Sequence, residues 1–241
     1  SGTDRNDVNL ANSVQTSGGG VNYTPSSPMH MGGTGTLTVT GTTVTRNTAG
    51  SMAAGGGGAD LYTFAFAAPG GIGSGTANIT TSTFSNNQAT SANGGAIVNE
   101  SLPTTVATST FTSNSAGNRG GGIFVAGGGG TLALDGTTPS VTFSGNAATN
   151  GGSSISTTGV VTVSGTNVTL GGDVEVASGG SWTNNAGSVI SPTNLIIVGG
   201  TFNANDSTTN ISGNFTFGPT PGNEVAFPGT FNSGTGTFNF N

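Results

Sequence analysis

The sequence predicts an all-β fold: one domain built as a parallel β-helix, or β-solenoid, of about ten coils stacked along an axis. Three observations predict it. A short motif recurs four times, glycine-rich steps follow its copies, and short runs of alternating apolar and polar residues occupy much of the 241-residue chain. Glycine, asparagine, threonine and serine occur in every window, and each disfavours the interior of a helix. A repeated motif in a chain without helices favours a solenoid, because every coil of a solenoid repeats the same local environment. The strands of a sandwich do not repeat one environment in this way.

The motif consists of an apolar residue followed, three positions later, by asparagine. In stacked coils the asparagines would lie above one another as a hydrogen-bonded ladder, and the apolar residues would form a column inside the solenoid. The expected ladder consists of Asn47, Asn87, Asn114 and Asn146, and the expected column of Val44, Phe84, Phe111 and Phe143.

Paired glycines after the motif are expected at sharp corners of the coils, because glycine adopts φ > 0 without strain. The corner residues predicted in this way are Gly94, Gly95, Gly120, Gly121, Gly151 and Gly152. The spacing between the motif copies is irregular, so we expect loops to bulge from one face at residues 67–75 and 127–130.

Along the chain, residues 1–25 are polar and weakly patterned, and we expect them to form an N-terminal arm or cap. Residues 26–241 are expected to form the solenoid, with motif-bearing coils to about residue 157 and shorter coils, separated by Gly-Gly, after it. A right-handed solenoid is expected from the general rule for parallel crossovers. The clearest strand candidates are residues 37–40, 160–163, 168–170, 173–176, 195–198 and 215–217.

Residues 84–97 combine Phe84-Ser-Asn-Asn87 with Gly94-Gly-Ala-Ile97, and they closely resemble the repeat of the polymorphic outer-membrane proteins and related right-handed β-helix passengers of autotransporters. Residues 111–123 resemble this repeat with Gly122 in place of the alanine, while the copies at Val44 and Phe143 are degenerate. The resemblance covers about residues 37–157. From residue 195 the chain resembles the Gly-Thr-Phe-Asn repeats of large bacterial surface proteins. The resemblance implies a secreted, surface-displayed β-helix with an adhesive or structural role.

The composition excludes several functions. Three basic residues, all arginine, stand against nine acidic ones, for a net charge of −6. No basic patch can therefore bind nucleic acid. No apolar run approaches the ~20 residues of a membrane-spanning helix, and the chain has no cysteine for disulfides or thiolate metal sites. We expect no cofactor.

One pair of acidic residues is a candidate catalytic site. Asp173 and Glu175 alternate with Val174 and Val176 in one predicted strand, so both carboxylates would project from one face, about 7 Å apart. That separation is found in inverting glycosidases. The alternative is that the two acids lie on a solvent-exposed strand face and have no catalytic role. No basic residue lies nearby in the sequence to bind an anionic sugar.

Three other candidates have plainer interpretations. His30 has no second histidine or cysteine with which to share a metal, and the glycine-rich run before Asp60 is a single copy of a calcium-binding repeat that needs consecutive copies. Tyr23, Tyr62 and Trp182 are too few for a convincing sugar-stacking platform.

The chain stays strand-like to its last residue, and no amphipathic helix covers either end of the predicted solenoid. Other copies of the chain are therefore expected to cover the terminal coils, with Phe231, Phe238 and Phe240 at the assembling end. We expect a non-catalytic extracellular structural protein of the bacterial cell surface that self-assembles into a filament or layer, with head-to-tail contact as the expected arrangement. The alternatives are a monomeric adhesin or autotransporter passenger fragment that binds a host receptor or glycan, and a β-helix that binds or cleaves polysaccharide.

Overall fold

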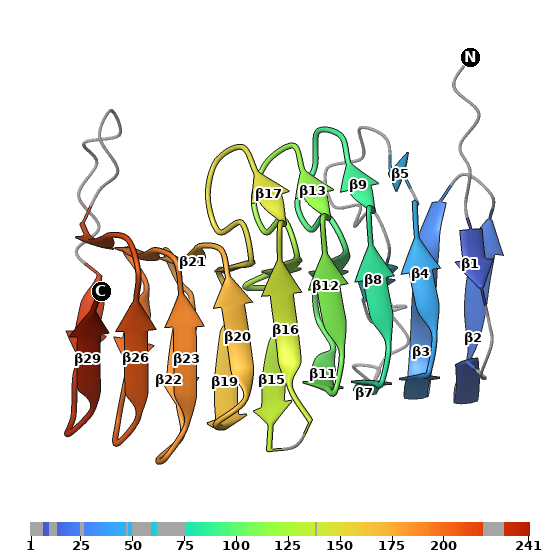
Figure 1. Cartoon of the computed structure of the whole chain (residues 1–241). Helices are drawn as coiled ribbons and strands as arrows, with labels where there is room; N and C mark the ends of the chain where they lie inside the picture. The colour runs from blue at the N-terminus through green and yellow to red at the C-terminus, as the bar shows by residue number, and fades with distance from the viewer. Residues whose placement is uncertain are drawn as a thin grey trace.

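The computed structural model describes residues 7–9, 14–24, 27–46, 48–49, 59–61, 76–137, 139–218 and 229–241. The regular elements in these residues are all β-strands, and they stack in parallel into a β-solenoid, which confirms the predicted fold class. Figure 1 shows the stack from the side, advancing from β1 at one end to β29 at the other. The handedness and the count of about ten coils stay predictions.

Each coil contributes one strand to each of three long sheets. The first sheet contains β3 (Ser27–Thr40), β7 (Thr76–Thr80), β11 (Pro103–Ala107), β15 (Thr131–Gly136), β19 (Val160–Gly165), β22 (Ser181–Asn184), β25 (Thr201–Asn203) and β28 (Thr230–Asn232). The second contains β4 (Thr43–Thr45), β8 (Thr83–Ser85), β12 (Thr110–Thr112), β16 (Val141–Ser144), β20 (Val168–Gly171), β23 (Val189–Pro192), β26 (Thr208–Ile211) and β29 (Thr237–Phe240).

The third sheet contains β6 (Ala59–Leu61), β10 (Ile97–Asn99), β14 (Ile123–Val125), β18 (Ile155–Thr157), β21 (Val174–Ala177), β24 (Leu195–Val198) and β27 (Phe215–Phe217). The long strand β3 joins it to the first sheet, because its beginning pairs with β6 and its end with β7. The strands expected at 195–198 and 215–217 coincide with β24 and β27, and the other four candidates overlap β3, β19, β20 and β21.

A fourth, short sheet stands above the second and third sheets in the first half of the solenoid (Figure 1). It consists of β5 (Thr48–Ala49), β9 (Gln88–Ala89), β13 (Ser115–Ala116) and β17 (Ala147–Ala148), and it ends at β17. Pro103 lies opposite Thr131, 28 residues later, whereas Val160 lies opposite Ser181, 21 residues later. We call the place where the short sheet ends, between β17 and β21, the step.

The N-terminal end of the described stack differs from the rest in strand direction. β1 (Asp7–Asn9) runs antiparallel to β4, and β2 (Val14–Thr24) runs antiparallel to β3. The other strand pairs in the described part of the long sheets are parallel, so reversed strands end the parallel ladder at this side. The division into an arm of residues 1–25 and a solenoid of residues 26–241 stays a prediction.

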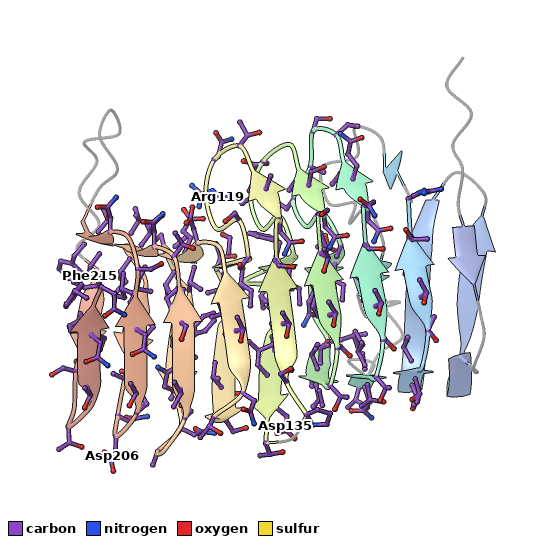
Figure 2. The ribbon with its side chains drawn as sticks, viewed as in Figure 1. Arg119, Asp135, Asp206 and Phe215 are labelled. Atoms are coloured by element: carbon purple, nitrogen blue, oxygen red, sulfur yellow. The ribbon has the colours of Figure 1, made fainter. Side chains whose placement is uncertain are left out.

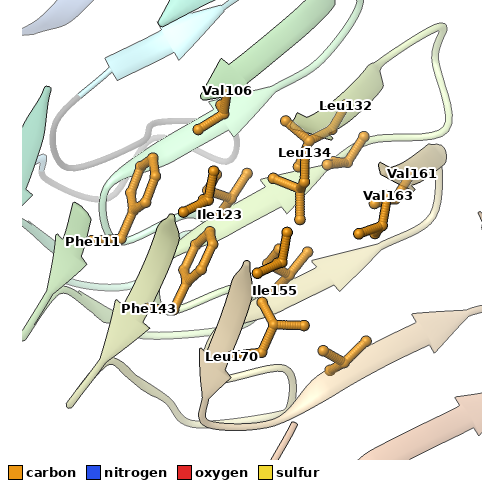
Figure 3. Close-up of a cluster of buried hydrophobic side chains, with 14 of the residues drawn as sticks. Val106, Phe111, Ile123, Leu132, Leu134, Phe143, Ile155, Val161, Val163 and Leu170 are labelled. Carbon is orange, nitrogen blue, oxygen red and sulfur yellow. The ribbon is translucent and has the colours of Figure 1, made fainter. Parts of the chain in front are cut away.

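Columns of side chains from successive coils fill the core. In the second sheet Phe84 stacks on Phe111 with ring centroids 5.1 Å apart, and Phe111 stacks on Phe143 at 4.6 Å, each pair within 9° of parallel. Leu170 continues this column (Figure 3). Each apolar residue covers the one in the coil before it, so burial comes from neighbouring coils, as expected of a solenoid.

Candidate functional site

The motif asparagines form a ladder between coils. The amide nitrogen of Asn87 donates to Asn114 Oδ1 at 2.9 Å, and that of Asn114 donates to Asn146 Oδ1 at 3.0 Å. Each of these oxygens also accepts the backbone N–H of the preceding asparagine, and the amides of Asn114 and Asn146 donate back to the carbonyl of the motif phenylalanine one coil earlier. Asn87 and Asn114 are fully buried. Asn47 lies outside the described residues.

Replacing Asn114 with alanine is expected to destabilise the fold by about 2–4 kcal/mol, because it removes the oxygen that accepts the backbone N–H and the amide of the buried Asn87, and the amide that donates to the carbonyl of Phe84. Asn150→Ala is the matched control: its amide also bonds to the coil before it, at Asn118 Oδ1, but the residue is exposed. The control should lose less than about 0.5 kcal/mol. Urea unfolding measures both free energies of unfolding. Equal losses in the two variants would show that burial of the asparagine ladder does not contribute to stability.

A second ladder was not anticipated. Thr42, Ser82 and Ser109 are buried at the corner between the first and second sheets. The backbone N–H of Thr42 donates to Ser82 Oγ, and that of Ser82 donates to Ser109 Oγ. The signal was present in the sequence, since each residue lies two positions before the apolar residue of the motif.

The paired glycines serve the corner for two different reasons. Gly94, Gly120 and Gly152 have φ values of 67°, 70° and 62°, the left-handed region that suits glycine. Gly95 and Gly121 instead lack room for a side chain: a Cβ on Gly95 would lie 2.2 Å from the carbonyl oxygen of Gly121. Only the first glycine of these two pairs therefore fits the expectation based on φ.

The third glycine pair, Gly151 and Gly152, is displaced by one residue relative to the other two. Gly151 lies opposite Arg119, not opposite a glycine of the preceding corner. Its φ is 143°, and a Cβ there would lie 2.9 Å from the carboxylate of Glu175. Gly151 therefore packs against the side chain of Glu175 at the step, where a larger residue would not fit.

The two acids do not share a solvated strand face, because Asp173 precedes β21 and is half-buried, while Glu175 lies within it and is buried. The expectation of a solvated pair is therefore wrong for Glu175. Glu175 is 2% exposed; its carboxylate lies 3.3 Å from Arg119 Nη1 and accepts a hydrogen bond of 2.6 Å from Ser156 Oγ. Figure 2 shows Arg119 near the step. Asp173 lies nearer the surface and accepts a hydrogen bond from the amide of Asn194. The basic partner was missed because it lies two coils earlier, 56 residues away in sequence.

This arrangement suits a structural pair better than a glycosidase. A general acid must reach the sugar, and Glu175 is covered. Burial raises the pKa of the Glu175 carboxyl, while the hydrogen bond from Ser156 and the charge of Arg119 lower it. Since the net shift is upward, the folded state favours protonation of Glu175 more than the unfolded chain does.

The raised pKa predicts a dependence of stability on pH. The contribution of Glu175 is fully present below the pKa of the unfolded chain, near 4.5, and is lost as pH rises through the folded pKa. Glu175→Gln resembles the protonated acid, so it should match wild type near pH 4 and exceed it at pH 7. Burial also raises the pKa of Glu100, but that contribution is common to both proteins.

Thermal melts from pH 4 to 8 check this prediction. Arg119→Gln is the comparison variant: it removes the positive charge that lowers the pKa, so its stability should fall more steeply with pH than that of wild type. Wild-type and Glu175→Gln curves that run parallel over this range would contradict the assignment.

The C-terminal end exposes aromatic side chains. Phe231 and Phe238, named from the sequence as assembly residues, are partly buried against the core, and Phe240 is 61% exposed. Phe215 and Phe217 on β27 were not named, although they are 36% and 50% exposed. Their exposure could not be predicted from the sequence, because β27 resembles the buried strands before it.

The remaining candidates do not form a site in the described residues. Trp182 is fully buried, and its Nε1 donates to Asn184 Oδ1 at 2.8 Å, so it cannot stack on a sugar. Among the residues whose side chains are described, no group of three or more histidine, aspartate or glutamate side chains could share a metal. His30 lies in β3 and Asp60 in β6, where side chains are not described, and Tyr62 lies outside the described residues.

The described part of the chain contains no helix long and apolar enough to cross a membrane. Neither a protein-family model nor a curated protein nor a solved structure matches this sequence. The fold is therefore assigned from the pairing of its strands.

Proposed function

We propose that this chain is a non-catalytic extracellular structural protein, a β-solenoid subunit that self-associates through its ends at the cell surface. One observation carries the proposal: at the C-terminal end, Phe215 and Phe217 occupy core positions and are nevertheless exposed to solvent. Exposed strand edges beside apolar side chains promote association with other chains. A structural role requires such contacts, whereas a monomeric adhesin would gain nothing from them.

Composition supports an extracellular location. Cysteine is absent, so there is no thiol to oxidise, and three arginines without any lysine offer few sites to trypsin-like proteases. The resemblance of residues 84–97 to the repeat of polymorphic outer-membrane proteins and autotransporter passengers agrees with surface display. The glycan-cleaving alternative is weakened by the burial of Glu175.

Negative-stain electron microscopy over a dilution series tests the proposal. Filaments, layers or discrete oligomers that persist at low protein concentration are the expected result. Isolated rods about 40 Å long at every concentration, the length of nine stacked strands, would contradict self-association. They would favour the adhesin, with binding sought on the loops.

A further inference from the structure

Two Asn-Gly pairs lie in the loops that lead from the short sheet to the third sheet (Figure 1), Asn93-Gly94 and Asn150-Gly151. Asparagine is among the residues that proteins lose chemically over time. The peptide nitrogen after an asparagine can attack the side-chain amide of that asparagine, and glycine hinders this attack least because it has no Cβ. Both pairs therefore share the same intrinsic tendency to lose ammonia, and a difference between them has to come from the fold.

The fold holds the first pair by its reacting atoms. The N–H of Gly94 donates to the backbone carbonyl of Arg119 at 2.9 Å, and the side-chain oxygen of Asn93 accepts the N–H of Arg119 at 3.2 Å. Gly94 is also buried. Attack on Asn93 therefore has to wait until both hydrogen bonds between the coils open.

The second pair is more open to reaction. Asn150 is exposed, and both its backbone N–H and its side-chain nitrogen donate to Asn118, each at 2.8 Å. In the part of the chain that the structure describes, no group donates to its side-chain oxygen. Gly151 bonds to the neighbouring coil through its carbonyl, which accepts the N–H of Gly120. The side chain that would be attacked therefore lies open to solvent.

We propose that Asn150 is a site of spontaneous deamidation, a modification that is independent of the proposed self-association. Hydroxide from the solvent removes the proton of the Gly151 nitrogen, which attacks Asn150 Cγ. A bond from this nitrogen to Cγ forms, the bond from Cγ to Nδ2 breaks, and Nδ2 leaves as ammonia after it takes a proton from water. Water then opens the five-membered imide at either carbonyl, which gives aspartate or isoaspartate at residue 150. Nothing is oxidised or reduced.

The product weakens the contact between coils at the step. A carboxylate at residue 150 has no N–H to donate to Asn118 Oδ1, so this hydrogen bond is lost. Isoaspartate also adds one carbon atom to the main chain beside Gly151, where a Cβ would already lie 2.9 Å from the carboxylate of Glu175. Gly151 then has to move away from Glu175, and the buried carboxylate becomes accessible to water.

Peptide mapping by mass spectrometry, applied to the folded 241-residue chain during incubation at pH 9, is the first test. Conversion replaces an amide NH2 with OH, and fragmentation assigns the resulting increase in mass to residue 93 or 150. We expect conversion at Asn150 to be about tenfold faster than at Asn93 or more, because the reaction at Asn93 waits for two hydrogen bonds to open.

The same chain unfolded in guanidinium chloride is the control for intrinsic reactivity. Both pairs should then convert at similar rates, because the hydrogen bonds of the fold are gone. Asn150→Gln should stop conversion at residue 150 and leave that at Asn93 unchanged, since glutamine would have to form a less favourable six-membered ring. Equal rates at Asn93 and Asn150 in the folded chain would overturn the proposal. So would a folded Asn150 that stays intact while the unfolded chain converts both pairs.

Thermal melts test the effect on the step. Wild type that has been incubated at pH 9 should melt at a lower temperature than fresh protein when both are measured at pH 7. Asn150→Gln should keep its melting temperature through the same incubation. Wild type that is converted at Asn150 but melts unchanged would overturn the weakening of the step.

Discussion

Alanine in place of Gly121 is expected to destabilise the solenoid by about 3–5 kcal/mol, enough to prevent soluble expression of a marginally stable chain. The new Cβ would lie 2.3 Å from the carbonyl oxygen of Ala147 and 2.5 Å from that of Ser153. Both atoms belong to the backbone of the next coil, so neither can move aside without separating the coils. The free energy of unfolding in guanidinium chloride measures the effect.

Gly128→Ala is the control for that experiment. Gly128 also lies in a glycine-rich segment, between β14 and β15, but it is exposed, and a Cβ there would approach nothing closer than Glu100 O at 3.4 Å. This variant should stay within about 0.5 kcal/mol of wild type. Similar losses in both proteins would mean that close approach between coils does not explain the role of Gly121.

Truncation of Phe111 to alanine is the second change with a large expected effect. Its ring lies between Phe84 and Phe143 in the core column, and it is fully buried. Its removal would leave a cavity between coils, and such truncations cost about 3–5 kcal/mol. Urea unfolding followed by circular dichroism should show the loss.

Phe111→Leu keeps most of the volume and should lose less than half as much as Phe111→Ala. Val160→Ala removes an apolar side chain that is 42% exposed, and it should lose less than about 1 kcal/mol. A loss at Phe111→Ala no larger than at Val160→Ala would contradict a core held together by the column.

The fold class could be predicted because a solenoid repeats its local environment. A residue that returns at the same place in each coil, such as Asn87 and then Asn114, meets its own counterpart, so periodicity alone indicates what lies beside it. The same reasoning could have found Ser82 and Ser109, which recur two positions before the motif phenylalanine.

Features that break the repeat could not be predicted. The burial of Glu175 depends on Arg119 from two coils earlier and on the end of the short sheet at β17. Phe217 is 50% exposed although it aligns with the buried Ile197 of the preceding coil, and its own sequence resembles that of a buried strand. For Glu175 the decisive neighbour lies outside the local pattern.

The step also has a consequence for how the molecule unfolds. Coils on its N-terminal side are joined to one another through four strand pairs, including those of the short sheet, whereas from the coil of β17 onward each coil is joined to the next through three. In a chain whose coils contact only their neighbours, the part with fewer strand pairs per junction opens first. Glu175 lies just after the first of these weaker junctions, and its ionisation weakens the packing there as pH rises. We therefore expect the part of the rod from the step onward to open before the N-terminal part, and more readily on the alkaline side.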